Sequence, residues 1–279
     1  MSTKEEKSSS STESILEWEK VSCTGIVPEG RSGASLTILG NTGYLFGGLS
    51  KSNAKRGPNN DMYMAKIRNE KLEWSVPKIE GSRPSGRWDH TSTLIGDNFI
   101  LVFGGSVSRT LRTNETWIFD TVVQKWTHLK HLDINAPSPR SGHTCTLVDE
   151  NMLYCFGGFG GEGYSRREMN DMYVLDCTDL EKLKWRRVNA KGTPPEARSG
   201  HASCAVRDRD IIVCGGWNSH TKFRDIHIFN TKTCAWTRCR RDMNVRITLT
   251  YLLTHSLIHS LNQPINQLRY QDGDTPSPV

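Results

Sequence analysis

The sequence lacks the features that mark membrane and secreted proteins. Its 279 residues contain no uninterrupted apolar run of about 18 residues, the length that a membrane-spanning helix needs. The N-terminus, MSTKEEKSSSSTES, is polar and has no apolar segment of the kind found in signal peptides. These absences predict no membrane insertion and a cytoplasmic location, with the nucleus as the alternative.

Paired metal-ligand motifs are also missing. The 8 cysteines include no Cys-x-x-Cys pair, which argues against a zinc finger or a thioredoxin-like centre. Cys145, Cys155, Cys204 and Cys214 lie inside apolar, strand-like runs, where a free thiol behaves as a small hydrophobic side chain. We therefore predict no metal, no cofactor and no disulfide framework.

Catalytic motifs and dense charge clusters are absent as well. There is no Gly-x-Ser-x-Gly elbow and no acid–base pair at a recognisable spacing, so we predict no catalytic residues and no enzyme activity. The net charge of +6 is spread along the chain and is not the footprint of a nucleic-acid-binding protein. A mild excess of this sign favours acidic partners.

What the sequence has is an internal repeat. Four segments begin with Pro-x-x-Arg: PEGRSGA, PSGRWDH, PSPRSGH and PEARSGH, from Pro28, Pro84, Pro137 and Pro195. Each continues into an apolar run that ends in Gly-Gly, then an acidic residue with a ring two places later, and closes on a tryptophan. The glycines are Gly47, Gly48, Gly104, Gly105, Gly157, Gly158, Gly215 and Gly216, and the tryptophans are Trp74, Trp126, Trp185 and Trp236. Because five features recur in one order, each unit is predicted to be one structural module.

Each unit is expected to fold as four short strands. In the third unit, 143–148 and 153–158 are apolar and nearly continuous, as in strands covered on both faces. The segment 171–176 alternates, and 184–188 carries polar residues outward, as an outer strand does. Such a sheet cannot cover its own two apolar faces, but radial stacking of several sheets does.

These motifs resemble those of the kelch family. The resemblance covers about 18–239 and looks most like the Rab-effector and host-cell-factor types. It implies an all-β, kelch-type β-propeller with four complete four-stranded blades and an orphan N-terminal strand. The expected division is a disordered tail at 1–14, kelch repeats at 15–239 and a low-complexity tail at 240–279. The units run over 28–78, 84–130, 137–189 and 195–239, with 15–22 as an extra outer strand containing Trp18.

Kelch propellers usually have six or seven blades, so four leave the ring incomplete. We expect the functional product to continue past Cys239 with further Gly-Gly units, and the open blade faces to cause self-association. The tail repeats with a period of four residues from Leu249. It reads either as a translated tandem CTCA repeat, the favoured interpretation, or as a helix with Leu249, Leu253, Leu257 and Leu261 on one stripe.

Repeated charged residues form the first candidate site. By resemblance to kelch propellers, Arg31, Arg87, Arg140 and Arg198 lie around one mouth of the central channel, where they could bind acidic side chains of a partner. The alternative, slightly favoured, is that each pairs with the recurring acidic residue and ties blade to blade. Those acidic residues are Asp61, Glu115, Asp171 and Asp225.

Repeated histidines form the second. His90, His143 and His201 each follow an arginine by three places, and they invite a metal interpretation. However, equivalent residues on successive blades diverge around the axis, and no cysteine or carboxylate accompanies them at ligand spacing. We therefore expect them to line the channel and to serve partner binding.

Two functions remain open. The favoured one is a protein–protein interaction scaffold or adaptor that binds other proteins, including acidic segments, through loops at the propeller faces. The loops that differ most between units follow the Gly-Gly pairs, at 50–60, 106–114, 159–170 and 217–224; we call them the Gly-Gly loops. The alternative is a small-molecule or metal-dependent enzyme that uses the central channel.

Overall fold

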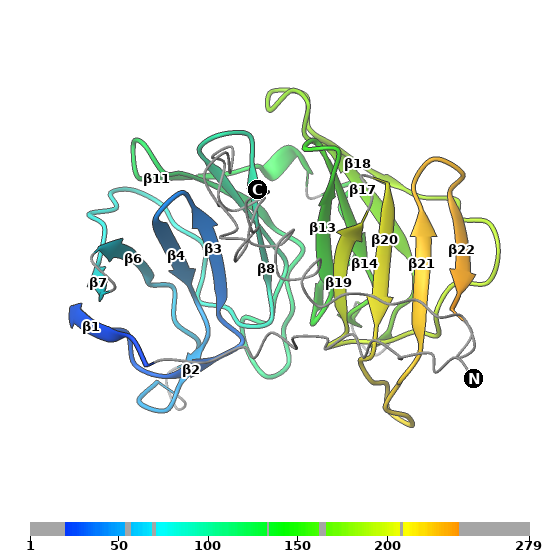
Figure 1. Ribbon diagram of the computed structural model, residues 1–279, viewed down its shortest axis with the longest axis horizontal. Helices are drawn as coiled ribbons and strands as arrows, with labels where there is room; N and C mark the ends of the chain where they lie inside the picture. Colours follow the sequence, from blue (N-terminus) through cyan, green and yellow to red (C-terminus); the bar gives the residue numbers. More distant parts are fainter. Residues whose placement is uncertain are drawn as a thin grey trace, which may run out of the picture.

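Four antiparallel sheets, here called blades 1 to 4, form the framework of the described chain (Figure 1). The computed structural model describes residues 20–53, 57–68, 71–132, 134–161, 166–206 and 209–239. The tail predictions for 1–14 and 240–279, and Trp18, lie outside these residues. No helix in the described part is long and apolar enough to cross a membrane.

Each blade is a meander of four strands, listed from the innermost outward. Blade 1 contains β3 (Ser35–Leu39), β4 (Thr42–Phe46), β6 (Met62–Arg68) and β7 (Lys71–Ser75). Blade 2 contains β8 (Thr91–Ile95), β9 (Phe99–Phe103), β10 (Thr116–Asp120) and β11 (Lys125–His128). Blade 3 contains β13 (Thr144–Val148), β14 (Met152–Phe156), β17 (Met172–Asp176) and β18 (Lys184–Arg187). Blade 4 contains β19 (Ala202–Val206), β20 (Asp210–Cys214), β21 (Ile226–Asn230) and β22 (Ala235–Arg238). The prediction of four-stranded units is confirmed.

Short elements lie between the main strands. Around the Gly-Gly loops, β2 (Arg31–Ser32) pairs with β5 (Leu49–Ser50), and β15 (Phe159–Gly160) pairs with both β12 (Arg140–Ser141) and β16 (Arg167–Glu168). A 3-10 turn, η1 (Lys130–Leu132), leads out of blade 2. An additional strand, β1 (Ser22–Gly25), runs parallel to β7 on the outer edge of blade 1. Most of the predicted outer strand at 15–22 precedes the described residues.

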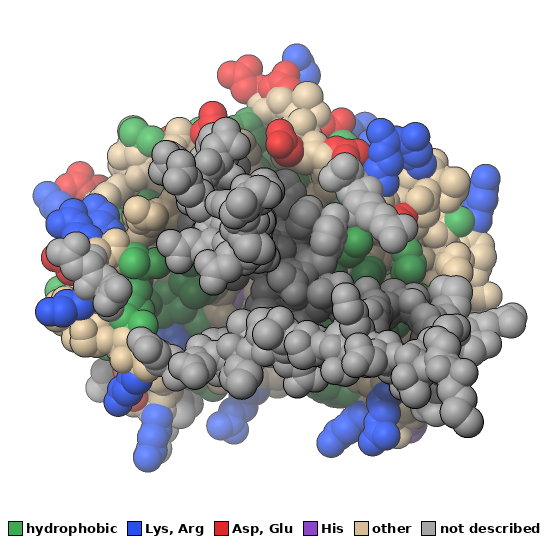
Figure 2. Space-filling view, in the orientation of Figure 1, with side chains coloured by type: hydrophobic (Ala, Val, Ile, Leu, Met, Phe, Trp, Pro, Cys, Tyr) green, Lys and Arg blue, Asp and Glu red, His purple; other side chains and the backbone are tan. Residues whose placement is uncertain are grey.

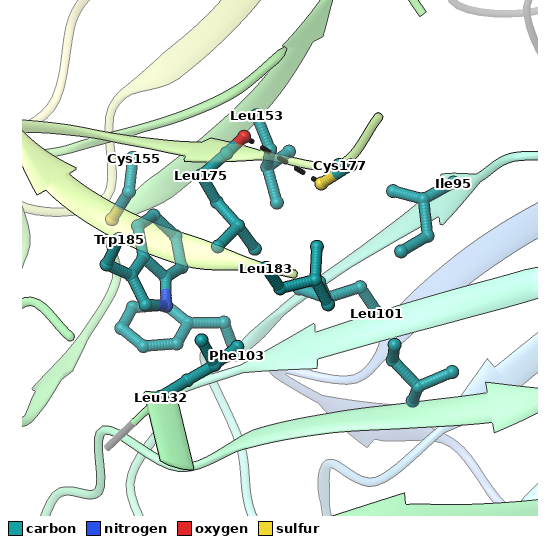
Figure 3. Close-up of a cluster of buried hydrophobic side chains, with 11 residues drawn as sticks. Ile95, Leu101, Phe103, Leu132, Leu153, Cys155, Leu175, Cys177, Leu183 and Trp185 are labelled. Carbon is teal, nitrogen blue, oxygen red and sulfur yellow. Dashed lines mark hydrogen bonds between the residues drawn. The ribbon is translucent and has the colours of Figure 1, made fainter. Parts of the chain in front are cut away.

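The blades stack in chain order through three apolar clusters. The innermost strands β3, β8, β13 and β19 are neighbours in that sequence, and the blades fan outward from them as an arc (Figure 1). Each interface repeats one contact, in which the closing tryptophan of one blade packs on the phenylalanine before Gly-Gly of the preceding blade. These pairs are Trp126–Phe46, Trp185–Phe103 and Trp236–Phe156, with ring centroids 4.9 to 5.0 Å apart. Figure 3 shows the cluster between blades 2 and 3, where Phe103 and Leu101 of β9 face Trp185 and Leu183.

The two end blades each have a face that no other described blade covers. Trp74 of blade 1, which has no described blade before it, is only partly buried, whereas Trp126, Trp185 and Trp236 are buried. At the other end, a Cβ added to Gly215 would meet nothing nearer than the Phe223 oxygen at 4.0 Å. At Gly104 the same atom would lie 2.9 Å from the Arg140 oxygen of the next blade. Within the described residues, blade 4 therefore lacks the neighbour that blades 1 to 3 have.

Candidate functional site

The repeated arginines are buried, and their side chains bind within their own blade. Arg87, Arg140 and Arg198 are 0% exposed. Arg140 and Arg198 make two-pronged ion pairs, to Asp171 at 2.7 and 3.0 Å and to Asp225 at 2.6 and 3.0 Å. Arg87 pairs with Glu115 at 2.6 Å. Each Nη1 also donates to the carbonyl of the first glycine of the Gly-Gly pair in its own blade, at 2.9 to 3.1 Å.

The backbone of each of these arginines binds the preceding blade. The Arg87 carbonyl accepts from Gly48 N, the Arg140 carbonyl from Gly105 N, and the Arg198 carbonyl from Gly158 N, each at 2.8 Å. One residue thus fixes the Gly-Gly turns of two adjacent blades, and both glycines of each pair have positive φ, which suits a residue without Cβ.

At three of the four repeat positions the structure shows what the arginine side chain contacts. Arg87, Arg140 and Arg198 each form an ion pair with the recurring acidic residue of their own blade, and none of the three guanidiniums has exposed surface. The link between blades comes from the backbone, whereas the ion pair stays within one blade. Arg31 shares the contact with the first glycine carbonyl, to Gly47, and lies over the Tyr63 ring at 5.0 Å. It differs in being only partly buried and, among the described residues, in making no ion pair with Asp61.

The repeated histidines link adjacent blades. Nε2 of His90, His143 and His201 lies 2.7, 3.2 and 2.9 Å from the hydroxyls of Ser35, Thr91 and Thr144, the first residue of the preceding innermost strand. Each ring also contacts the edge of the phenylalanine before Gly-Gly in that blade, at 5.2 to 5.3 Å. Burial, followed by the nearby arginine, lowers the pKa of His90 and His201 to about 3, which keeps both rings neutral. All three histidines are buried, at 5 to 7% exposure, and their role in lining the channel and in partner binding stays a prediction.

A third recurring position, two residues after each arginine, connects the blades by backbone alone. Asp89 N donates to the Gly33 carbonyl, Gly142 N to the Asp89 carbonyl, and Gly200 N to the Gly142 carbonyl. All four residues have φ between 53° and 64°, in the left-handed region, and Asp89 is the one non-glycine among them. Sequence reasoning missed this series, although Gly-to-Asp variation in the Arg-Ser-Gly-His motif was a visible signal.

Exposed positive charge recurs on the Gly-Gly loops. Lys51, Arg109, Arg166, Arg167, Lys222 and Arg224 are all exposed and come from four successive loops. Figure 2 shows Lys and Arg side chains along the lower edge of the molecule, where these loops lie in Figure 1. Among described residues of these loops before the recurring acidic position, Glu168 is the one acidic side chain. We call this side of the molecule the loop face.

Neighbouring loops on the loop face contact one another. Arg166 donates to the Thr110 carbonyl at 2.8 Å, and Arg112 lies over the Phe159 ring at 5.0 Å. Ser219 donates to Glu168 at 2.9 Å. Burial and the neighbouring Arg166 lower the pKa of Arg112, so two like charges lie close together there. The loops of blades 2, 3 and 4 thus form one continuous basic surface.

One cluster of metal-ligand side chains is present in the described residues. His143, Cys145 and Cys155 bring donor atoms within 4.8 Å of one another. The reason given for excluding a metal, that no cysteine accompanies the histidines, is therefore wrong for His143. Cys155 is ten positions from Cys145 in the sequence, and the β13–β14 register places them directly opposite each other.

The fold and its repeated contacts define a β-propeller-type repeat protein. The KLHDC2/KLHL20/DRC7 Kelch-repeats domain model matches residues 8–158 and 44–248. This chain belongs to the kelch-repeat family.

Curated proteins show the same relationship. The chain is 39% identical over 229 residues to the dynein alpha chain of the flagellar outer arm from Chlamydomonas reinhardtii, covering 78% of this chain and 5% of that protein. It is 30% identical over 226 residues to the F-box/kelch-repeat protein At1g51550 from Arabidopsis thaliana, covering 77% and 46%. It is 28% identical over 242 residues to host cell factor from Drosophila melanogaster, covering 75% and 16%. The chain thus spans less than half the length of each of these relatives.

Proposed function

We propose that this chain is a protein-interaction scaffold whose loop face binds acidic segments of partner proteins. Kelch-repeat proteins are typically interaction scaffolds or adaptors and are generally not enzymes. The observation that carries the proposal is the loop face itself, where three successive loops interlock and present exposed Arg109, Arg166 and Lys222.

The composition of the loop face supports a protein partner. Leu111 is 58% exposed and Trp217 is 50% exposed, and both belong to Gly-Gly loops. Large apolar side chains surrounded by charge are typical of interaction surfaces, in which a central aromatic residue supplies much of the binding energy. The surrounding positive charge accelerates encounter with an acidic partner and opposes basic ones.

The test uses a fluorescently labelled decaglutamate peptide, with decaglutamine as the uncharged comparison, in anisotropy titrations at low salt. We expect the wild-type chain to bind decaglutamate, and Arg109→Glu combined with Lys222→Glu to weaken that binding about tenfold or more. The matched control is Arg186→Glu combined with Arg187→Glu, which reverses two exposed charges on the outer strand β18. Equal losses in the two double variants, or no preference for decaglutamate, would contradict a specific loop face.

The open sheet faces supply the second part of the proposal. Blades 1 and 4 end the described arc, and we propose that they mediate self-association when the chain is alone, because uncovered apolar sheet faces favour association. Light scattering on the purified chain tests this, and a stable monomer with one sharp melting transition would contradict it. Cytoplasmic or nuclear location stays a prediction.

A further inference from the structure

The His143–Cys145–Cys155 cluster lies at the interface of blades 2 and 3. A tight turn, in which Asp149 and Glu150 have φ of 48° and 60°, joins β13 to β14 and fixes their register. That register makes Cys145 and Cys155 a directly opposed pair, whose side chains project from the same side of the sheet. His143 immediately precedes β13, so all three donors belong to one hairpin of blade 3.

The repeat itself does not require these thiols. The position five residues after the arginine is Cys145 in blade 3, but Leu36, Ser92 and Ser203 in the other blades. The position two residues before Gly-Gly is Cys155 in blade 3, but Leu45, Val102 and Val213 elsewhere. A packing role is therefore filled by other side chains in three blades, and only blade 3 combines a histidine with two opposed cysteines.

The spacing of the donors suits a tetrahedral cation. With Zn–S bonds of about 2.3 Å, two thiolates on one zinc lie about 3.8 Å apart. The donor atoms here lie within 4.8 Å of one another, so small side-chain rotations close the site. A ring nitrogen of His143 is one of the three donor atoms of the cluster, and the Thr91 hydroxyl lies 3.2 Å from Nε2 of the same ring.

The surroundings favour a soft, divalent cation. Cys155 is fully buried in the cluster that contains Phe103 and Trp185, where an uncompensated charge is costly (Figure 3). Two thiolates and one divalent cation together are neutral, and a thiolate–imidazole ligand set selects zinc over the hard cations magnesium and calcium.

We propose that His143, Cys145 and Cys155 bind one Zn²⁺ ion between blades 2 and 3. The fourth coordination position is left to water or to the Thr91 hydroxyl, which already contacts His143. Zinc binding would hold the two strands of the β13–β14 hairpin together. Through the contact of His143 with Thr91 of β8, it would also stabilise the packing of blade 3 on blade 2. This site is independent of the loop face.

The first experiment uses the unaltered chain, stripped of metal with a chelator and kept reduced. We expect it to take up Co²⁺ with a thiolate-to-cobalt charge-transfer absorption that Zn²⁺ abolishes, and Zn²⁺ to raise its melting temperature. Zn²⁺ should also protect Cys145 and Cys155 from alkylation, as read by peptide mass spectrometry. No charge-transfer band, or protection confined to other cysteines, overturns the proposal; so does recovery of Cys145 and Cys155 as a disulfide that after reduction binds no metal.

Variants then assign the ligands. Cys145→Ser and Cys155→Ser should each lose the charge-transfer band and the zinc-dependent rise in melting temperature. The matched control is Cys177→Ser, because Cys177 is buried in the same apolar interface but is not one of the three proposed ligands. His143→Gln is compared with His201→Gln, which removes the equivalent link between blades without touching a cysteine. Loss of metal binding in the two control variants as well would contradict this ligand set.

Discussion

Adding one methyl group at Gly104 should separate backbone strain from the contact between blades. Gly104 has φ of 65°, and its Cβ would lie 2.8 Å from Cε1 of His143 and 2.9 Å from the Arg140 carbonyl oxygen of the next blade. Gly215 is the equivalent glycine of blade 4, with the same φ of 65°, and its Cβ would meet nothing nearer than 4.0 Å. The two alanine variants therefore share the same backbone strain, and they differ in whether the new Cβ contacts the next blade.

The magnitudes follow from those two contributions. An L-residue in the left-handed region costs about 1 kcal/mol or somewhat more, and this applies to both Gly104→Ala and Gly215→Ala. Overpacking a fixed contact adds about 1 to 3 kcal/mol, and this applies to Gly104→Ala alone, because the opposing atoms include backbone. We expect Gly104→Ala to lower the free energy of unfolding by about 2 to 4 kcal/mol and Gly215→Ala by about 1 kcal/mol.

Urea denaturation followed by tryptophan fluorescence measures both values, since every blade interface contains a buried tryptophan. The two variants and the wild type must be compared at the same protein concentration, because association would change apparent stability. Equal losses in both variants would refute the reasoning: they would mean that blade 4 has a neighbour in solution that occupies the space beside Gly215.

Three further predictions concern the blade interfaces. Trp126→Ala removes a ring that is 2% exposed and packs on Phe46 with ring centroids 4.9 Å apart, and should cost about 3 to 5 kcal/mol in urea denaturation; a loss below about 1 kcal/mol would contradict the strand assignment. Arg87→Glu with Arg140→Glu should unfold the chain, as judged by circular dichroism, because both guanidiniums are buried and ion-paired; a folded double variant that has lost partner binding would instead restore the exposed arginine ring. The wild-type chain should lose stability as the pH falls from about 7 towards 4. His201 is protonated below about pH 6.5 in the unfolded chain, whereas in the folded chain its pKa is about 3, so acid favours the unfolded state; in His201→Gln this decline should be shallower.

The fold was predictable because each blade is encoded locally. Apolar runs, Gly-Gly turns and a closing tryptophan recur in one order, and each feature reports the conformation of its own segment. The four strands of every blade follow from this, as does the burial of Trp126, Trp185 and Trp236. Whether an arginine binds a partner or pairs within its blade could not be predicted from its own segment, because it depends on how closely two Gly-Gly turns enclose the side chain.

The candidate sites also depend on contacts between segments that are far apart in the sequence. The basic residues of the loop face are visible in the sequence, but their continuity depends on contacts such as Arg166 with Thr110, which join loops of different blades. Cys145 and Cys155 looked like two separate core thiols until the β13–β14 register placed them opposite each other beside His143. The sequence alone determined the repeat, the strands and the residues that each blade offers. Which of these residues meet depends on hairpin register and blade stacking, because these bring together atoms that lie at irregular distances along the chain.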